Sequence, residues 1–259
     1  MIGAIIQARM SSTRLPGKVL REICGQPLLA YLIKRVKLSK KIECIVLATS
    51  SDREDDPIAA CASLLGVHVY RGSLENVLDR FYQAAQTHKI EHAVRITGDC
   101  PVIDPAICDR LIERYQGSKA DYAGLSPAFA EGLDCEVISF PALVQANRDS
   151  KNRSDKEHVT LYVRNHPDIF RMTQLENQED ESRYRVTVDN AEDFDVVSGI
   201  ITHFMEKTGD FTALWPQIRI FLDKHPDLLK KNAHIERNAG LKRSLMADGT
   251  ATGPGGMCS

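Results

Sequence analysis

The stretch I-I-Q-A-R-M-S-S-T-R-L-P-G-K-V-L, residues 5–20, determines how this chain folds and what it can bind. Its apolar start predicts a first strand over Ile2–Gln7, and a loop with three cations, three hydroxyls and a Pro-Gly pair follows, before a segment of helical spacing. Backbone amides and hydroxyls in such a loop can surround phosphate oxygens while the cations balance their charge. The P-loop spacing is absent, because Val19 stands where that motif needs a hydroxyl. The loop therefore predicts a polyphosphate site of a different kind.

The first loop supplies six candidate site residues. Arg14 and Lys18 are the candidates for catalysis, since their charge can stabilise a leaving phosphate group. The candidates for binding are Ala8, Arg9, Ser12 and Thr13. The alternative is a charged surface turn between a strand and a helix.

Strand and helix patterns alternate through the first half of the chain. Further strands are expected over residues 44–49, 67–70 and 93–97, and helices over residues 28–36, 58–65, 76–87 and 105–115. This alternation predicts an α/β fold with a mainly parallel, Rossmann-like sheet and helices on both faces. Ligands of such sheets bind at the carboxyl ends of the strands, which is where the first loop lies.

The regular alternation of strands and helices changes after residue 122. Residues 124–132 are expected to be a loop; strands are expected over 135–139, 170–175 and 184–189, and helices over 141–149, 154–164, 191–205 and 214–222. In the 154–164 helix, Ser154 and Glu157 have capping-box spacing. We interpret residues 1–246 as a single domain in which residues 124–183 form a small inserted arm for dimerisation. Residues 247–259 are expected to be a disordered tail.

A second polar cluster, T-G-D-C-P-V-I-D-P, occupies residues 97–105. Asp99 directly follows an apolar strand, and Mg²⁺ on nucleotide phosphates commonly takes one or two such carboxylates. A turn-capping role is the alternative for Asp99. Asp104 precedes Pro105 and a helix, so it is expected to be an N-cap.

The pattern A-R-x-x-S-T-R-L-P-G-K-x-L resembles the nucleotide loop of the CMP-sugar synthetases, and the whole chain is similar to the spore-coat-polysaccharide type of cytidylyltransferase. Residues 98–101 resemble the G-D-x-P motif whose aspartate binds metal, which implies Mg²⁺ on Asp99. Residues 188–193 resemble the V-D-x-x-x-D segment, which implies Asp189 as the second ligand. Asp193 falls at a helix start, where it can cap the helix. The fold implied is the sheet of the nucleotide-diphospho-sugar transferases.

The resemblance also extends to residues outside these motifs. Arg71, Ser73 and Arg80 match a segment that can contact base or phosphate, although Asp79 and Arg80 could equally be a surface pair. A second group is expected near the sugar: Thr97, Cys100 and Glu136. For His158, a structural role is favoured over contact with substrate.

The resemblance implies an enzyme that transfers a cytidylyl group from CTP to an acidic sugar and releases pyrophosphate, with Mg²⁺, as a homodimer, for surface polysaccharide synthesis. The residues themselves indicate only a nucleoside triphosphate. CMP-KDO synthetases have Gln and Glu where this chain has Thr97 and Cys100, so another acidic sugar, such as a nonulosonic acid, is favoured. Two hypotheses compete with it: a glycosyltransferase, and a nucleotide-binding domain without turnover. Glycosyltransferases usually bind metal through a D-x-D at a strand end, whereas the D-x-D of this chain, residues 193–195, is expected at a helix start.

Composition limits the remaining classes of function. A net charge of −2 argues against a broad nucleic-acid surface. No apolar run approaches the ~20 residues of a membrane helix, and no secretory leader is expected. The seven cysteines include no C-x-x-C pair, which is typical of reduced thiols in a cytoplasmic protein and argues against a zinc site.

Overall fold

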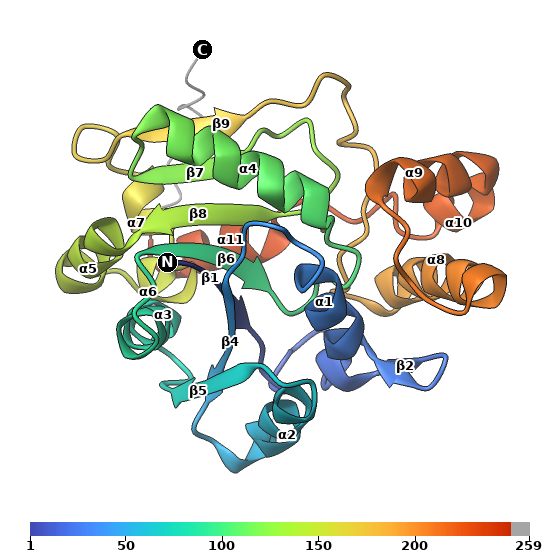
Figure 1. The fold of residues 1–259 in the computed structure, drawn as a ribbon, viewed down its shortest axis with the longest axis horizontal. Coiled ribbons are helices and arrows are strands. Elements are labelled where there is room, and N and C mark those ends of the chain that lie inside the picture. Colours follow the sequence, from blue (N-terminus) through green and yellow to red (C-terminus); the bar gives the residue numbers. More distant parts are fainter. Residues whose placement is uncertain (250–259) are drawn as a thin grey trace.

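The structure is a computed structural model that describes residues 1–249, and a seven-stranded sheet forms its centre (Figure 1). The strand order is β5-β4-β1-β6-β8-β7-β9. Four of its six pairings are parallel, which confirms the expected mainly parallel sheet. The strands are β1 (Ile2–Gln7), β4 (Cys44–Ser50), β5 (His68–Gly72), β6 (His92–Thr97), β7 (Tyr122–Leu125), β8 (Cys135–Ser139) and β9 (Met172–Leu175).

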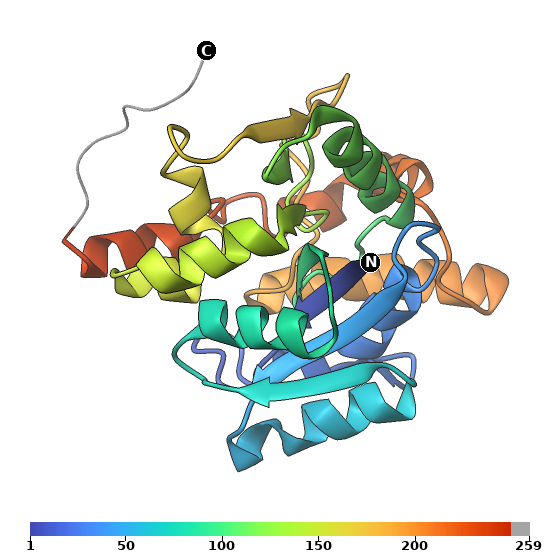
Figure 2. The same ribbon diagram turned by 60° about the vertical axis from the view of Figure 1, so that its left-hand side comes forward.

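Helices cover both faces of this sheet, as expected (Figures 1 and 2). One face packs against α1 (Leu28–Val36), α2 (Asp56–Leu64) and α4 (Pro105–Ser118). The other packs against α3 (Val77–Thr87), α5 (Phe140–Asp149) and the short α7 (Leu161–Arg164). The remaining helices are α6 (Arg153–Glu157), α8 (Ala191–Thr208), α9 (Trp215–Lys224), α10 (Pro226–Lys230) and α11 (Ala239–Ala247), with the 3₁₀ turns η1 (Lys18–Leu20) and η2 (Arg53–Asp55).

Hydrophobic spacing explains how these layers form. In α1, Leu29, Leu32, Ile33 and Val36 lie at helical spacing and are all buried against the sheet. β1 is buried on both faces over almost its whole length, as its unbroken apolar run predicts for a central parallel strand.

A third core cluster lies beside the sheet, where α8 and α9 pack on the segment 184–188. Tyr184, Val186 and Val188 are buried there, and their alternation with the polar Arg185 and Thr187 resembles the pattern of a strand. The expected strand over residues 184–189 is nevertheless wrong. Within the described residues this segment has only one isolated bridge, between Glu131 and Arg185.

The helical segment expected after the first loop is confirmed as α1, and between the loop and α1 lie the single turn η1 and a small hairpin of β2 (Glu22–Ile23) and β3 (Gln26–Pro27). Three other local predictions need correction. The helix expected over 154–164 is divided into α6 and α7, because the backbone around Val159 adopts a positive φ of 24°. Asn152, rather than Ser154, is the N-cap residue of α6. Strand β7 extends to Leu125 and therefore includes the first two residues of the loop expected over 124–132.

The strands of the expected inserted arm belong to the main sheet. β8 pairs with β6, β7 pairs with β8, and β9 pairs with β7. The premise that strands in residues 124–183 lack partners is therefore wrong, and dimerisation through this region stays a prediction. Of the expected tail, residues 250–259 lie outside the described part of the chain, and α11 extends to Ala247.

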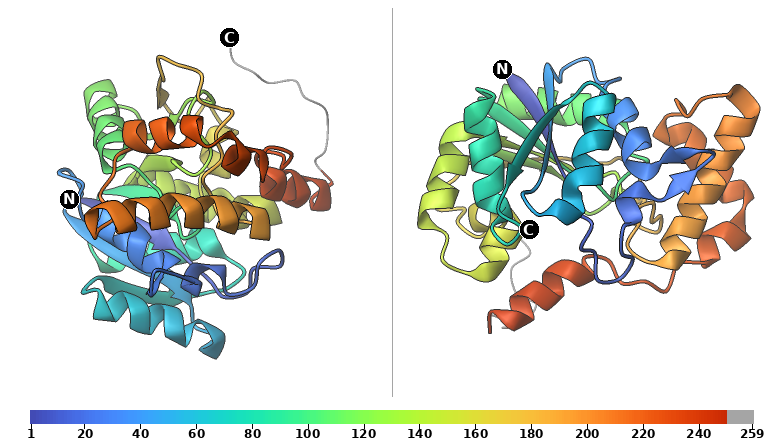
Figure 3. Two further views of the ribbon diagram at one scale, coloured as in Figure 1. Left: turned by 90° about the vertical axis from the view of Figure 1, so that its right-hand side faces the viewer. Right: turned by 90° about the horizontal axis from the view of Figure 1, so that it is seen from below.

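The last described helix lies apart from its neighbours in sequence. Figure 3 shows α8, α9 and α10 together at one side of the molecule, whereas α11 lies across the structure, beside α6. Neither α10 nor α11 was expected from the sequence. In the described part of the chain, every helix is too short or too polar to span a bilayer.

Candidate active site

A cleft of about 560 Å³ opens at the carboxyl ends of β1 and β6. Its lining comes from the first loop, the turn after β6, Asp189, the start of α3, and residues of α6 and α11. Six lining side chains are cationic and four are acidic, so the cleft has an excess of positive charge. The cations are Arg9, Arg14, Lys18, Arg80, Arg153 and Arg243, and the acids are Glu75, Asp99, Glu157 and Asp189. This position agrees with the rule for ligands of parallel sheets.

The first loop is held in shape by contacts with its neighbours. The Met10 amide donates to Asp55 Oδ1 at 2.7 Å, and Leu15 is buried beneath the loop. Gly17 has a φ of 67°, a left-handed conformation that favours glycine, and its amide donates to the Met10 carbonyl at 3.1 Å. Asp55, which the sequence analysis missed, also accepts from the hydroxyl of Thr49. Burial would raise the pKa of Asp55, but these hydrogen bonds lower it.

The same loop leaves several backbone donors available. Among the described residues, the amides of Ser11, Thr13 and Arg14 have no hydrogen-bond partner. Ser12 instead turns its hydroxyl toward the Leu15 amide, at 3.4 Å. Unpaired amides beside cations are the groups that bind phosphate oxygens, as the sequence analysis expected.

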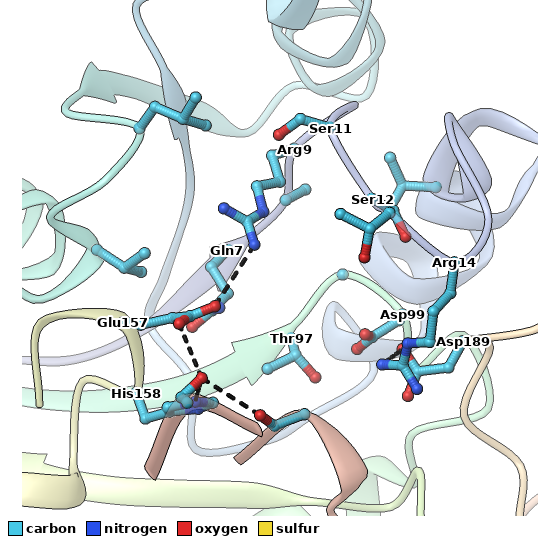
Figure 4. Close-up of a pocket in the computed structure, with 18 of the residues that line it drawn as sticks. Gln7, Arg9, Ser11, Ser12, Arg14, Thr97, Asp99, Glu157, His158 and Asp189 are labelled. Carbon is cyan, nitrogen blue, oxygen red and sulfur yellow. Dashed lines mark hydrogen bonds and ion pairs between the residues drawn. The ribbon is translucent and has the colours of Figure 1, made fainter. Parts of the chain in front are cut away.

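Lys18 joins the two aspartates that were expected to bind metal. Its Nζ lies 2.8 Å from Asp99 Oδ2 and 2.8 Å from Asp189 Oδ1. An Arg14 guanidinium nitrogen lies 2.7 Å from the same Asp189 oxygen. Figure 4 shows Arg14, Asp99 and Asp189 gathered on one side of the cleft. The structure thus brings together four residues that lie far apart in the sequence, with 171 positions between Lys18 and Asp189.

Burial and charge together set the protonation of this cluster. Burial would lower the pKa of the Lys18 ammonium, but the charges of Asp99 and Asp189 outweigh it and raise that pKa. Burial would likewise raise the pKa of Asp99, whereas Lys18 brings it down to about 2. Lys18 is therefore charged and Asp99 ionised at neutral pH.

The segments that carry the two aspartates are tied to each other and to β1. Asp99 follows Gly98, where a Cβ would lie 2.9 Å from the carbonyl oxygen of Gln7, so only glycine fits this approach. The Val188 amide donates to the Asp99 carbonyl at 2.8 Å, which fixes Asp189 beside Asp99.

Asp193 lies behind Asp189 and has a structural role. Its buried carboxylate accepts from the amides of Asp189 and Asn190 and pairs with Arg185 Nε at 2.8 Å. The sequence analysis expected a cap here, and the capping box of α8 confirms it. Asp104 is also confirmed as an N-cap, of α4.

Most of the predicted binding residues do line the cleft. They are Ala8, Arg9, Ser12, Thr13, Arg80 and Thr97. Arg80 is only 1% exposed, and its Nε has no hydrogen-bond partner within the described residues. Burial, reinforced by the charge of Arg9, lowers the pKa of Arg80 to about 10.

Four predicted binding residues lie outside the lining of the cleft. Arg71 Nε and NH2 donate to the Ser50 and Asp52 carbonyls. Ser73 instead supports α3, because its carbonyl accepts from Arg80 at 2.7 Å. The Cys100 side chain is buried, and its Sγ lies 3.2 Å from the Thr97 hydroxyl.

Glu136 is the fourth of these, and it is buried in the sheet. Burial would raise its pKa, but Arg95 and Arg164 bring it down to about 2. Thr160 donates to the same carboxylate at 2.8 Å.

The sequence analysis missed the wall formed by α6 and α11. Ser244 Oγ donates to Glu157 Oε2 at 2.9 Å and lies 2.9 Å from His158 Nε2, while Arg9 lies 3.6 Å from Glu157. Arg243, on the same helix, lines the cleft and has no ion-pair partner in the described part of the chain. Thr97 lies between this wall and the aspartates (Figure 4). Helix α11 is remote in sequence and matches no motif. At the end of α6, contact with substrate was considered for His158, which lines the cleft, but a structural role was favoured.

The two aspartates form a donor set that fits Mg²⁺. Their oxygens share one ammonium nitrogen at 2.8 Å each, so they lie no farther apart than twice that distance. Mg²⁺ prefers oxygen ligands and usually combines one or two carboxylates with waters and substrate phosphates. No group of three or more potential protein ligands occurs among residues 1–249, so phosphate and water would complete the coordination.

Comparison with known proteins agrees with this geometry. Residues 3–223 match the family model described as cytidylyltransferase. The chain is 37% identical over 230 residues to the spore coat polysaccharide biosynthesis protein SpsF of Bacillus subtilis, covering 86% of this chain and 94% of that protein. A 3-deoxy-manno-octulosonate cytidylyltransferase of Anaeromyxobacter dehalogenans is 31% identical over 133 residues, 51% of this chain and 53% of that protein.

Among solved structures, a cytidylyltransferase from Leptospira borgpetersenii serovar Hardjo-bovis superposes with a TM-score of 0.83 at 31% identity. The match covers 88% of this chain and 96% of that one. This chain belongs to the cytidylyltransferase family.

Proposed function

We propose that this protein transfers the cytidylyl group of CTP to an acidic sugar and releases pyrophosphate, in a Mg²⁺-dependent reaction that supplies surface polysaccharide synthesis. The observation that carries the proposal is the cluster of Arg14, Lys18, Asp99 and Asp189 beside a loop of unpaired amides. Cations and free amides suit a triphosphate, and the paired carboxylates suit the metal that accompanies it.

The walls of the cleft differ in chemistry, and this difference orients the two substrates. The wall nearest α3 contains the aliphatic side chains of Leu74 and Val77 together with Arg80. A flat base needs such apolar surface and a few polar contacts. The polar wall, formed by residues of β1, β6, α6 and α11, suits a hydroxylated acceptor: Gln7, Thr97, Glu157, His158, Arg243 and Ser244.

Catalysis in this arrangement depends on positioning and charge. A sugar oxygen attacks the α-phosphorus, and charge develops on the phosphate oxygens and on the leaving pyrophosphate. Arg14 and Lys18 would stabilise that charge, and the loop amides would hold the oxygens. Asp99 and Asp189 would bind Mg²⁺, which supplies charge stabilisation at the phosphates when bound.

The surroundings of the D-x-D add to the argument against a glycosyltransferase. Asp193 of the D-x-D is buried against Arg185, and Asp195 pairs with Lys231 at 2.9 Å. Neither carboxylate lines the cleft.

A substrate panel tests the proposal. The four nucleoside triphosphates are each combined with a nonulosonic acid, KDO and a neutral hexose, with and without Mg²⁺, and pyrophosphate is measured. We expect release with CTP, an acidic sugar and Mg²⁺ together. Release with a different triphosphate would overturn the assignment of the base, and release with the neutral hexose alone would overturn that of the acceptor. Transfer from a nucleotide sugar without pyrophosphate would support the glycosyltransferase instead.

We also propose a cytoplasmic homodimer. The six cysteines in the described residues are all unpaired, as in a reducing compartment. Related synthetases, by the resemblance stated above, form dimers.

A further inference from the structure

We infer that Gln7 is a specificity-determining residue, which presents its amide hydrogens to an oxygen of the acceptor sugar. This inference deepens the proposed function and rests on it. It starts from a row of polar side chains that crosses three neighbouring strands of the central sheet. The row is Gln7 on β1, Arg95 on β6 and Glu136 on β8.

The position of this row is unusual for the face on which it lies. In the strand register, Ile5 is opposite Arg95, and Arg95 is opposite Glu136. Two residues away along β8, Ile138 packs into the apolar core beneath α3 and α5. The polar row begins where that core ends, at the edge of the sheet that faces the cleft.

Contacts within the row fix the orientation of the Gln7 amide. Arg95 Nε donates to Gln7 Oε1 at 3.1 Å. Because a guanidinium has only donors, the oxygen of the amide must face Arg95 and the nitrogen must face away. Arg95 is itself held by Glu136, and both side chains are at least 85% buried. Glu136 also accepts from Tyr122 and Thr160.

The Gln7 side chain lines the cleft, and its amide nitrogen has no partner among the described residues. Gln7 lines it on the polar wall, next to Thr97, its partner in the register of β1 and β6. No hydrogen bond within residues 1–249 uses Gln7 Nε2. Two N–H donors of fixed orientation therefore remain for a ligand, and oxygens of a carboxylate or hydroxyl are their matching acceptors.

A buried ion pair is seldom the most stable filling for such a position, since apolar residues of similar size often serve equally well. The Arg95–Glu136 pair has a functional role if it orients the Gln7 amide. Arg95 and Glu136 are then positioning residues, because they act on the sugar through Gln7.

The test uses Gln7→Glu, which keeps an oxygen toward Arg95 but replaces the two donors by a charged oxygen. We expect the KM for the acidic sugar to rise roughly 10- to 100-fold, the range for a lost hydrogen bond to a charged group. The affinity for CTP, measured by calorimetry, should stay unchanged. Gln86→Glu, on the exposed side of α3, is the matched control and should change neither quantity.

Arg95→Lys provides a second variant, since it keeps a cation beside Glu136 but has no Nε to orient Gln7. It should raise the KM for the sugar while the KM for CTP stays constant. Sugar binding to protein saturated with a non-hydrolysable CTP analogue is measured in parallel by ligand-observed NMR.

The outcomes separate the two proposals. A wild-type protein that neither binds acidic sugars nor releases pyrophosphate overturns the proposed function, and the inference with it. An active wild-type protein whose sugar KM is unchanged by Gln7→Glu overturns the inference alone. An equal loss of CTP and sugar affinity also overturns it, because Gln7 would then support the whole cleft.

Discussion

Replacing Lys18 by Met tests whether one ammonium holds the two aspartates together. The substitution keeps an unbranched side chain that is one heavy atom shorter, and it removes the charge and the hydrogen-bond donors. Asp99 would then lose its cationic partner, whereas Asp189 would keep Arg14 and Arg185. The pKa of Asp99 should rise, because burial would act on it without compensation.

The expected loss of stability follows from how buried these groups are. The side chains of Lys18, Asp99 and Asp189 are 10%, 25% and 16% exposed. Removing one partner of a buried ion pair costs about 3–5 kcal/mol, and the remaining arginines place this case near the lower limit, about 3 kcal/mol. In a domain of this size, that corresponds to a decrease in Tm of roughly 6–12 °C.

Differential scanning fluorimetry with and without millimolar Mg²⁺ measures both effects. Mg²⁺ should raise the Tm of Lys18→Met more than that of the wild type, since it can replace the lost positive charge between the carboxylates. Lys34→Met, on the exposed face of α1, is the control and should keep the wild-type Tm. An unchanged Tm in Lys18→Met would refute the stabilising role of the ion pairs. A lowered Tm without response to Mg²⁺ would refute the pairing of Asp99 and Asp189 as metal ligands.

Three further predictions follow from the same geometry. Asp99→Asn and Asp189→Asn should each abolish Mg²⁺-dependent turnover while circular dichroism shows an intact fold; near-wild-type turnover at limiting Mg²⁺ would exclude that residue as a ligand. Asp99 and Glu136 have folded-state pKa values near 2, below their ordinary values near 4. Their contribution to the free energy of unfolding is therefore complete above those ordinary values and should be lost as the pH falls from about 4.5 to about 2. Urea unfolding at pH 5, 4 and 3 measures this loss, and Glu136→Gln should reduce the dependence of stability on pH. Light scattering at micromolar concentration should give a dimer, and a mass of 28.9 kDa would contradict it.

Most of the sheet could be predicted, because each of its strands carries its own local signal. β1 and β8 agree with their predicted bounds, since their apolar runs end at polar turns. The segment 184–188 failed because its apolar residues, which pack against α8 and α9, alternate with polar ones as they would in a strand, and the presence of a partner strand cannot be predicted from periodicity. The break at Val159 was also hidden, because it depends on a backbone conformation that its side chain does not indicate.

The phosphate side of the site was predictable for the same reason. Arg14, Lys18 and Asp99 belong to motifs that follow β1 and β6, and parallel topology brings the ends of these strands together. Asp189 belongs to a recognisable motif too, but the hydrogen bond from the Val188 amide to the Asp99 carbonyl places it there. The wall formed by α6 and α11 was not, because α11, which contributes Arg243 and Ser244, contains no motif. Glu136 was assigned to the sugar by resemblance, yet its carboxylate pairs with Arg95 and lies outside the lining of the cleft.

Helix α11 closes one side of the cleft although none of its side chains is buried. It is attached by polar contacts, from Ser244 to Glu157 and from Asp248 to the Ser154 amide, and it lies beyond the segment that matches the family model. An element with so little apolar contact can detach without unfolding the sheet. In evolution, such a wall can be exchanged separately from the catalytic core. Relatives could therefore diverge in the sugars they accept by changing their C-terminal sequence, while the chemistry of the triphosphate stays constant.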